Sequence, residues 1–246
     1  MGAFAQTWHA PGNSLSEWNS IQVAAGSNDR LQIVQPPVVK SGTAFRAEVR
    51  DGDVAVNANG QPIGGGWRAE GVGPVEIHSG DTVRFTWSTM LDAAYSVNPV
   101  GANGQAIWQV ITQWHQTDQD GGASPPVAFI IVQNQILLHL HRFDPANLLG
   151  SIEVGQYPVA TDLARGAWDD FQMDVRWALV GGWVKVWHNG VLMQDISPVA
   201  TLFPRKADVN QPGSNYLKMG LYRKPTPATP SGPFVLYHDE VRRSQE

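Results

Sequence analysis

Short segments with period-two alternation of apolar and polar residues, separated by turn residues, recur along most of this 246-residue chain. Such alternation, or a short run of β-branched and aromatic residues, is typical of β-strands. We expect strands at Thr43–Arg50, Asp81–Ser88, Ala106–His115, Ala128–Gln133, Gln135–Arg142, Asp170–Trp177, Gly182–His188, Tyr216–Tyr222 and Phe234–Val241. Helical periodicity is nearly absent, and only Leu15–Ala24 is expected to form a short helical turn.

Turn signals support an antiparallel arrangement of these strands. The pair Asn189-Gly190 between two alternating runs strongly indicates a hairpin, and Gln133-Asn134-Gln135 is a weaker signal of the same kind. Many short strands with almost no helix predict an all-β sandwich or barrel. We favour a β-jelly-roll, the concanavalin A-like sandwich of two antiparallel sheets, because its concave sheet suits a long polymer. No linker or repeat divides the chain, so one domain is expected over residues 1–246.

Composition excludes several classes of protein. The chain has no cysteine, so it has no disulfide, thiolate nucleophile or thiolate metal site. A net charge of −5 argues against a nucleic-acid-binding protein, which would normally be basic. No segment approaches the roughly 20 apolar residues of a membrane span. The ten tryptophans are expected mostly in the core, with some stacking against sugars.

The localisation is left open by the sequence. The first residues, MGAFAQTWHAPGNS, have neither the basic nor the apolar region of a signal peptide. The protein is therefore cytoplasmic, or a leader was removed, or it leaves the cell by lysis or on a virion. We expect it to act as a monomer.

Two predicted strands carry polar residues on one face. In a strand, Gln113 and His115 point to the same side, and an amide beside an imidazole is unusual for a hydrophobic core. These two residues are therefore candidates for a functional site. The alternative interpretation is a structural one, in which a buried histidine is hydrogen-bonded to the glutamine. In the second strand, Tyr216, Lys218 and Tyr222 share a face with Gly220, while the residues between them are apolar.

Arginine and glutamate alternate in two further segments. Arg46, Glu48 and Arg50 share one face of their strand, and Arg68 and Glu70 share a face of another. Such patterns often form cross-strand ion pairs and nothing more. A guanidinium held by a glutamate is also a preorganised ligand for a carboxylate.

Two clusters raise the question of metal binding. His139 and His141 lie on one face and could bind a metal, although lining a cleft or pairing with carboxylates is the favoured interpretation. The segment Asp118–Gly122 resembles a fragment of a calcium-binding loop, but it lacks the distal glutamate of an EF-hand and is interpreted as a plain loop.

The order RAE…QWHQ…WxDF…VWHNG…YLKMGLYR, closing with Tyr237–Arg242, resembles the heparin lyase I and glucuronan lyase group of jelly-roll polysaccharide lyases. The Gln-x-His and Tyr-x-Lys-x-Gly-x-Tyr strands are also similar to those of jelly-roll alginate lyases. The resemblance covers roughly residues 43–243. The chain departs from the alginate lyases by an alanine between Arg and Glu and by Arg223, which puts alginate in doubt as substrate.

The resemblance implies a lyase site in which Gln113 neutralises a carboxylate and His115 and Tyr216 transfer protons. The substrate-binding residues are then expected to be Arg46, Arg50, Arg68, Lys218, Tyr222 and His139. No cofactor is expected to be required for the chemistry. Related glucuronan lyases imply a structural calcium ion, whose ligands the sequence does not identify.

The chemistry of β-elimination calls for the same residue types. Donors directed at a uronate carboxylate stabilise the enolate that forms when the C5 proton leaves. A base must remove that proton, and an acid must protonate the departing O4. In syn elimination Tyr216 would do both; in anti elimination His115 would be the base and Tyr216 the acid.

Two other functions remain open. A non-catalytic carbohydrate-binding jelly-roll module would keep the aromatic residues and arginines but would not need His115 and Tyr216 together. A glycoside hydrolase needs two carboxylates, and the Glu-x-Asp-x-x-Glu pattern of concanavalin-like hydrolases is absent. A lyase without a leader could also be a component of a phage capsule depolymerase. The polymer, whether glucuronan, heparinoid, alginate or a bacterial exopolysaccharide, stays open.

Overall fold

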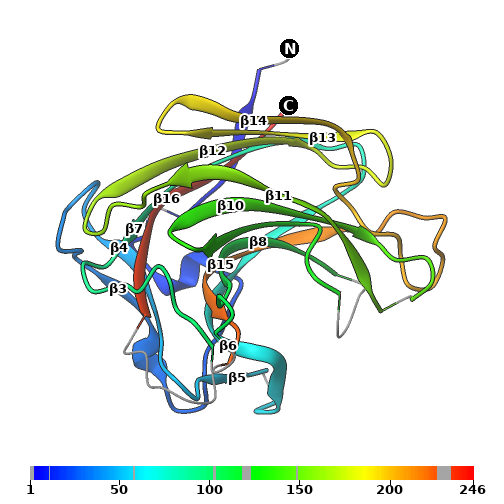
Figure 1. Ribbon diagram of the computed structural model, residues 1–246. Coiled ribbons are helices and arrows are strands. Elements are labelled where there is room, and N and C mark those ends of the chain that lie inside the picture. The colour runs from blue at the N-terminus through cyan, green and yellow to red at the C-terminus, as the bar shows by residue number, and fades with distance from the viewer. Residues whose placement is uncertain are drawn as a thin grey trace.

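Two antiparallel sheets stacked face to face form the molecule, as Figure 1 shows. The computed structural model describes residues 3–10, 12–57, 59–101, 104–117, 123–147, 149–225 and 234–246, without the side chains of residues 74–76. Within these residues the helical elements are two 3₁₀ turns, η1 (Leu15–Glu17) and η2 (Asn28–Arg30). The predicted all-β jelly-roll is confirmed.

The first sheet, here the β7 sheet, has its strands in the order β14 (Val191–Val199), β13 (Gly182–His188), β12 (Trp168–Arg176), β7 (Thr82–Leu91), β16 (Phe234–Gln245), β4 (Ala44–Val49) and β3 (Leu31–Val34), with β1 (Ala5–Ala10) paired to β16. The second, the β8 sheet, has the order β11 (Ser151–Thr161), β10 (Gln135–Phe143), β9 (Val127–Val132), β8 (Gln109–Gln116), β15 (Asn215–Arg223), β6 (Pro62–Ile77) and β2 (Ser20–Gln22), with β5 (Val54–Val56) paired to β6.

The two strands nearest the C-terminal end of the sequence occupy interior positions. β15 lies between β8 and β6 in one sheet, and β16 lies between β7 and β4 in the other. The alternation of apolar and polar residues predicted for Tyr216–Tyr222 agrees with the interior position of β15. Leu217, Met219 and Leu221 point into the core between the sheets, and the intervening residues point away from it.

Tryptophan rings fill the space between the sheets. Trp114 of β8 is fully buried and contacts Phe85 and Trp87 of β7 at ring-centroid distances of 5.0 and 6.0 Å. Trp177 lies 6.3 Å from the same ring. Trp18, Trp87, Trp114 and Trp177 are therefore core residues, and truncating such a ring typically costs about 3–5 kcal/mol of stability.

Both predicted hairpin turns are present. Asn189 and Gly190 have φ angles of 48° and 80°, and Gln133 and Asn134 have φ angles of 50° and 62°. Two successive left-handed residues characterise the type I′ turn, whose twist matches that of the flanking strands. The first turn joins β13 to β14 and the second joins β9 to β10.

The expected turn at Leu15–Ala24 is shorter than predicted. Only η1 is helical, closed by a capping box between Ser14 and Glu17, and the segment then continues as β2. The predicted strand segments did not include β1, β2, β3, β5, β11 or β14, and they covered β6 only through the Arg68 and Glu70 pattern. The hairpin signal at Asn189-Gly190 implied a strand where β14 lies. No helix in the described part of the chain is long and apolar enough to cross a membrane.

Candidate active site

Strand pairing brings the predicted catalytic residues together on the open face of the β8 sheet. Tyr216 on β15 lies directly opposite His115 on β8, and Lys218 lies directly opposite Gln113. On the other side of β15, Tyr222 is paired with Arg68 of β6. The side chains point away from the core because their strand neighbours fill it.

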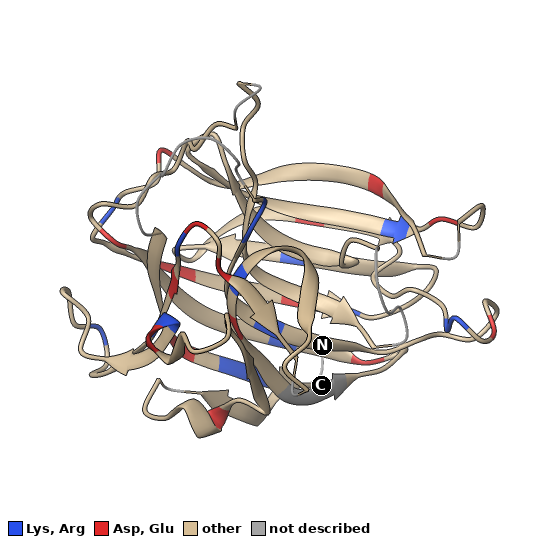
Figure 2. Cartoon of the chain, turned by 90° about the horizontal axis from the view of Figure 1, so that it is seen from below, with Lys and Arg blue, Asp and Glu red and all other residues tan. Residues whose placement is uncertain are grey.

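These residues line a groove with a volume of about 970 Å³. Its described polar lining comprises Gln22, Asn57, Arg68, Gln113, His115, Gln116, Thr117, Ser124, His139, His141, Glu153, Gln156, Tyr216, Lys218 and Tyr222. Its apolar floor includes Val110, Ala128 and Ile130, with the half-buried Trp108 packed edge-on against Tyr222. Figure 2 shows that Lys and Arg are interspersed with Asp and Glu over the strands and loops. The charge of the groove therefore depends on which basic and acidic side chains pair in and beneath it.

The carboxylate of Glu70 is the centre of a buried polar network. It is 2% exposed and accepts a hydrogen bond from the amide of Gln113. Arg68 Nη1 lies 3.4 Å and Lys218 Nζ 3.8 Å from its Oε2 atom. Two cations thus face one anion, which leaves one positive charge in excess beneath the groove.

The same network fixes the two cations in place. Arg68 Nη2 donates to the carbonyl of Gly64 at 2.8 Å, and its guanidinium lies 4.1 Å from the ring centre of Tyr222. Lys218 Nζ donates to Gln22 Oε1 at 2.8 Å. Burial lowers the pKa of Lys218, and the charge of Glu70 opposes that change. Neither cation can leave the groove without breaking these contacts.

His115 is arranged as a neutral proton acceptor. Its Nδ1 lies 3.0 Å from the carbonyl oxygen of Gln116. Because a carbonyl only accepts, Nδ1 carries the proton and Nε2 keeps its lone pair. Burial lowers the pKa of His115 to about 4, and the charge of Lys218 adds to the effect. The imidazole is therefore uncharged near neutral pH.

Two tyrosines border the site, and their surroundings differ. The ring of Tyr216 lies 5.7 Å from that of His115, and Lys218 Nζ lies 5.9 Å from the Tyr216 ring centre. Tyr222 instead packs between Arg68 and Trp108, and burial raises its pKa. Tyr216 is the tyrosine placed beside the imidazole.

Arg46 and Arg50 lie elsewhere, so the prediction that they line this cleft is wrong. Both are on or beside β4 of the β7 sheet, where Phe45 and Val49 enter the core. Arg46 and Arg50 both pair with Glu48 on the opposite face of that sheet. Period-two alternation fixes the face of a strand but not the sheet that the strand joins.

His139 lines the groove, as predicted, beside partners that the sequence did not reveal. His139 Nε2 lies 2.8 Å from Glu153 Oε2, and the rings of His139 and His141 are 4.1 Å apart. Burial lowers the pKa of His141 to about 4, and His139 adds to the effect. Glu153 was missed because β11 is an edge strand without clear apolar alternation.

Among the described residues, no cluster of carboxylates suited to the calcium ion that the family resemblance implies is found. Calcium takes six to eight oxygen ligands. The single cluster of three metal-ligand side chains found among the described residues, His139, His141 and Glu153, contains two imidazoles. The loop Asp118–Gly122 lies outside the described residues.

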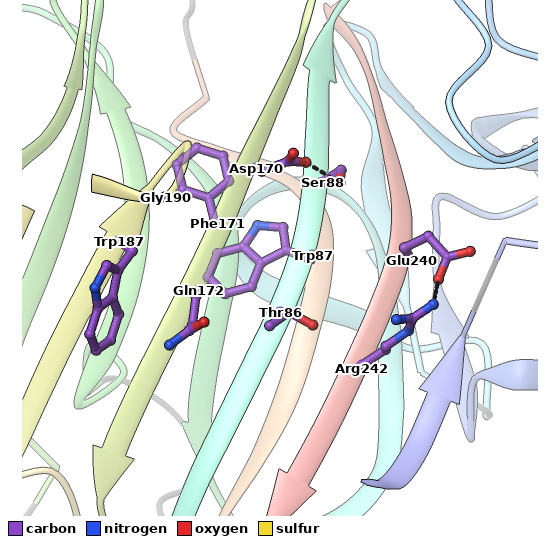
Figure 3. A pocket seen from close by; sticks show the side chains of 10 residues that line it. All are labelled: Thr86, Trp87, Ser88, Asp170, Phe171, Gln172, Trp187, Gly190, Glu240 and Arg242. Carbon is purple, nitrogen blue, oxygen red and sulfur yellow. Dashed lines mark hydrogen bonds and ion pairs between the residues drawn. The ribbon is translucent and has the colours of Figure 1, made fainter. Parts of the chain in front are cut away.

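A second, smaller hollow of about 470 Å³ lies on the β7 sheet (Figure 3). Trp187 of β13, Gln172 of β12 and Arg242 of β16 border it, and Arg242 pairs there with Glu240. Neither histidine nor tyrosine is among the described residues that line it. The combination of imidazole, phenol and amide found in the groove is therefore absent from this hollow.

An all-β sandwich whose open groove presents a neutral imidazole, a phenol and a preorganised set of amide and cationic donors defines a polysaccharide-processing protein of the jelly-roll class. A family model described as polysaccharide lyase matches residues 11–242. The chain belongs to this family and is a polysaccharide lyase. A search of curated proteins gives no match.

Several solved structures share the fold. An endo-β-1,4-glucuronan lyase from the fungus Trichoderma reesei is 17% identical with a TM-score of 0.73, covering 98% of this chain and 96% of that one. A family 7 alginate lyase, A1-II′, is 14% identical with a TM-score of 0.62, covering 98% and 100%. An alginate lyase from Klebsiella pneumoniae is 12% identical with a TM-score of 0.61, covering 96% and 99%.

Proposed function

We propose that this lyase cleaves a uronate-containing polysaccharide by β-elimination in the groove of the β8 sheet. The observation that carries the proposal is the direct pairing of Tyr216 with His115, next to the donors Gln113 and Arg68. The names of the structural neighbours, a glucuronan lyase and alginate lyases, support a uronate polymer as the substrate class.

The donors suit the carboxylate of the reacting uronate. Gln113 uses one amide hydrogen on Glu70 and has a second to offer, since an amide nitrogen carries two. Arg68 and Lys218 supply the excess positive charge of the Glu70 network. Fixed donors of this kind stabilise the charge that develops in the transition state without having to reorganise.

Proton transfer falls to the pair beside these donors. With Nδ1 held by the Gln116 carbonyl, Nε2 of His115 is the atom that can accept the C5 proton. Tyr216 then protonates O4, or performs both steps if the proton and O4 leave from the same side. The stereochemistry of the uronate decides between these two schemes.

The charges of the groove disfavour a hydrolase. Glycoside hydrolases of the common two-carboxylate kind need an acid and a second carboxylate on either side of the scissile bond. Glu153 is the one carboxylate among the described residues that line the groove, because Glu70 lies beneath it in ion pairs. Elimination requires no such pair.

The experiment is an assay with purified protein on glucuronan, heparin, alginate and a neutral glucan, following the ultraviolet absorbance of the unsaturated uronate product. Mass spectrometry separates the reactions, because hydrolysis products are heavier by one water. We expect unsaturated products from at least one uronate polymer and none from the glucan. A His115→Ala/Tyr216→Phe double variant controls for contaminating lyases. Fully hydrated products that depend on the same residues would overturn the proposal.

A further inference from the structure

His139, His141 and Glu153 form a compact cluster apart from the proton-transfer residues. His139 and His141 are two residues apart on β10, and Glu153 comes from the neighbouring strand β11, where it is paired with His141. One ligand atom from each lies within 4.8 Å of the other two. Metal-bound nitrogen and oxygen atoms lie roughly 2.0–2.2 Å from zinc, so small rotations of these side chains bring all three within reach of one ion.

The ligand types are those of a borderline transition metal. Two imidazoles and one carboxylate are a common three-residue set for zinc sites that keep an open position, whereas calcium and magnesium prefer oxygen. The Nδ1 atom of His141 is buried and has no hydrogen-bond partner of good geometry among the described residues.

A neighbouring residue supports the cluster. Gln156 Nε2 donates to Glu153 Oε2 at 3.1 Å, which orients the carboxylate toward His139. Partners of this kind fix the direction of a ligand and typically change metal affinity when removed. Three protein ligands leave further coordination positions of the ion for groups in the groove, which the cluster also lines.

The register of the strands relates the cluster to the catalytic residues. His139 is paired with Ala128 on β9, and Ala128 is paired with Gln113 on β8. Two strand spacings, roughly 10 Å, therefore separate His139 from Gln113 across the sheet. Only the methyl side chain of Ala128 lies between them in this row.

We propose that His139, His141 and Glu153 bind a zinc-class divalent ion whose open positions take a carboxylate of a second uronate of the substrate. The second half of this inference rests on the proposed function; the metal site does not. The ion would hold the polymer beside the reacting sugar without taking part in the elimination. It would thus contribute to substrate affinity and to the preference for polyuronates.

The metal site is tested first with zinc chloride alone, by calorimetric titration and thermal unfolding of the metal-free protein. We expect one site and, at a hundredfold excess over Kd, a rise in Tm of roughly 5–10 °C. Magnesium at the same concentration should give no rise. Glu153→Gln, at an exposed carboxylate, should weaken zinc binding at least tenfold without unfolding the protein. His139→Ala with His141→Ala should abolish it.

His9→Gln is the matched control, because His9 pairs with Glu240 at 3.0 Å on the β7 sheet without a second histidine. It should leave zinc affinity unchanged. No zinc binding by the wild type, or binding that His9→Gln removes and Glu153→Gln does not, would overturn the site.

The role of the metal site in substrate binding is tested on a polymer that the wild type cleaves. Removal of zinc and Glu153→Gln should each raise KM severalfold and leave kcat near its original value. An unchanged KM would overturn the role in substrate binding while leaving the metal site intact. A protein that binds zinc but cleaves no uronate polymer would instead overturn the proposed function.

Discussion

Gln113 and Lys218 lie opposite each other on neighbouring strands, and both are directed at the carboxylate of Glu70. The buried glutamate holds the donors of the groove in place before any substrate arrives. Its own charge is outweighed by Arg68 and Lys218 together. The groove therefore combines fixed geometry with a local preference for anions on a chain whose net charge is −5.

Tyr216→Phe removes the hydroxyl and keeps the ring. If Tyr216 protonates O4, kcat should fall by a factor of about 10²–10⁴ with little change in KM or Tm. Tyr222→Phe is the comparison, because its ring packs between Arg68 and Trp108 away from His115. Near wild-type turnover in a well-folded Tyr216→Phe protein would remove Tyr216 from the mechanism.

Substitution of His115 distinguishes the two stereochemical schemes. In anti elimination His115 is the base, so His115→Ala should be about as damaging as Tyr216→Phe. In syn elimination the loss should be milder, because the imidazole then mainly orients the substrate. The rates are to be compared on a glucuronate and a guluronate polymer, with melting curves recorded for each variant. Wild-type rates on both polymers would contradict either role.

The pH dependence follows from the lowered pKa of His115, about 4 in the folded protein against 6.5 for an ordinary histidine. A neutral base stays competent as the pH falls through 6.5, so kcat/KM should decline only towards pH 4. The unfolded chain binds this proton as the pH falls below 6.5, whereas the folded protein binds it only near pH 4. The contribution of neutral His115 to the free energy of unfolding is therefore complete above pH 6.5 and is lost as the pH falls to 4. An acid limb centred near pH 6.5 in kcat/KM would contradict this assignment.

Two Arg-Ala-Glu segments provide a matched pair of variants. Arg68→Ala removes a donor from the groove and should lower kcat by roughly 10²–10³. Arg46→Ala removes the equivalent residue of the same tripeptide in the other sheet and should leave kcat and KM unchanged. The assay is steady-state kinetics, with Arg68→Lys to test whether charge alone restores activity. Equal losses in the two alanine variants would show that the effect is not local to the groove.

Gly220 separates Lys218 from Tyr222 and has a φ of 141°. A β-carbon there would lie 2.2 Å from the carbonyl oxygen of Ala69 on β6, so Gly220→Ala must push the two strands apart. Gly181→Ala is the control, since its φ is 73° but no atom lies within 4 Å. Urea denaturation should show a loss of about 1 kcal/mol for the control and a clearly larger loss for Gly220→Ala. Equal losses would mean that the contact is relieved by relaxation.

The sequence predicted which residues share a face of a strand, but it did not predict which sheet each strand joins. Alternation correctly put Gln113 with His115 and Tyr216 with Lys218, because period two determines the face of a strand. The adjacency of β8 and β15, about a hundred residues apart in the chain, came only through the family resemblance. Nothing local distinguishes Arg46-Ala-Glu48 from Arg68-Ala-Glu70, since sheet membership depends on long-range pairing.

Other site residues were not predicted for the same reason, namely that their strands are defined by long-range pairing. Glu153 and Gln156 lie on β11, an edge strand with half-buried and exposed residues on both faces, so the strand has no periodic apolar pattern. Gln22 reaches Lys218 from β2, a strand of only three residues. Short and edge strands are defined by their partners more than by their own residues.

The interior positions of β15 and β16 also set the order in which the molecule can be built. Each sheet lacks a middle strand until the last segments of the chain have joined it, so contacts of long sequence separation must form before either layer closes. Proteins dominated by such contacts fold slowly. Because Tyr216 arrives on β15, the proton-transfer pair does not exist in any partly assembled form that lacks this strand. Recovery of catalytic activity during refolding should therefore coincide with closure of the whole sandwich and not precede it.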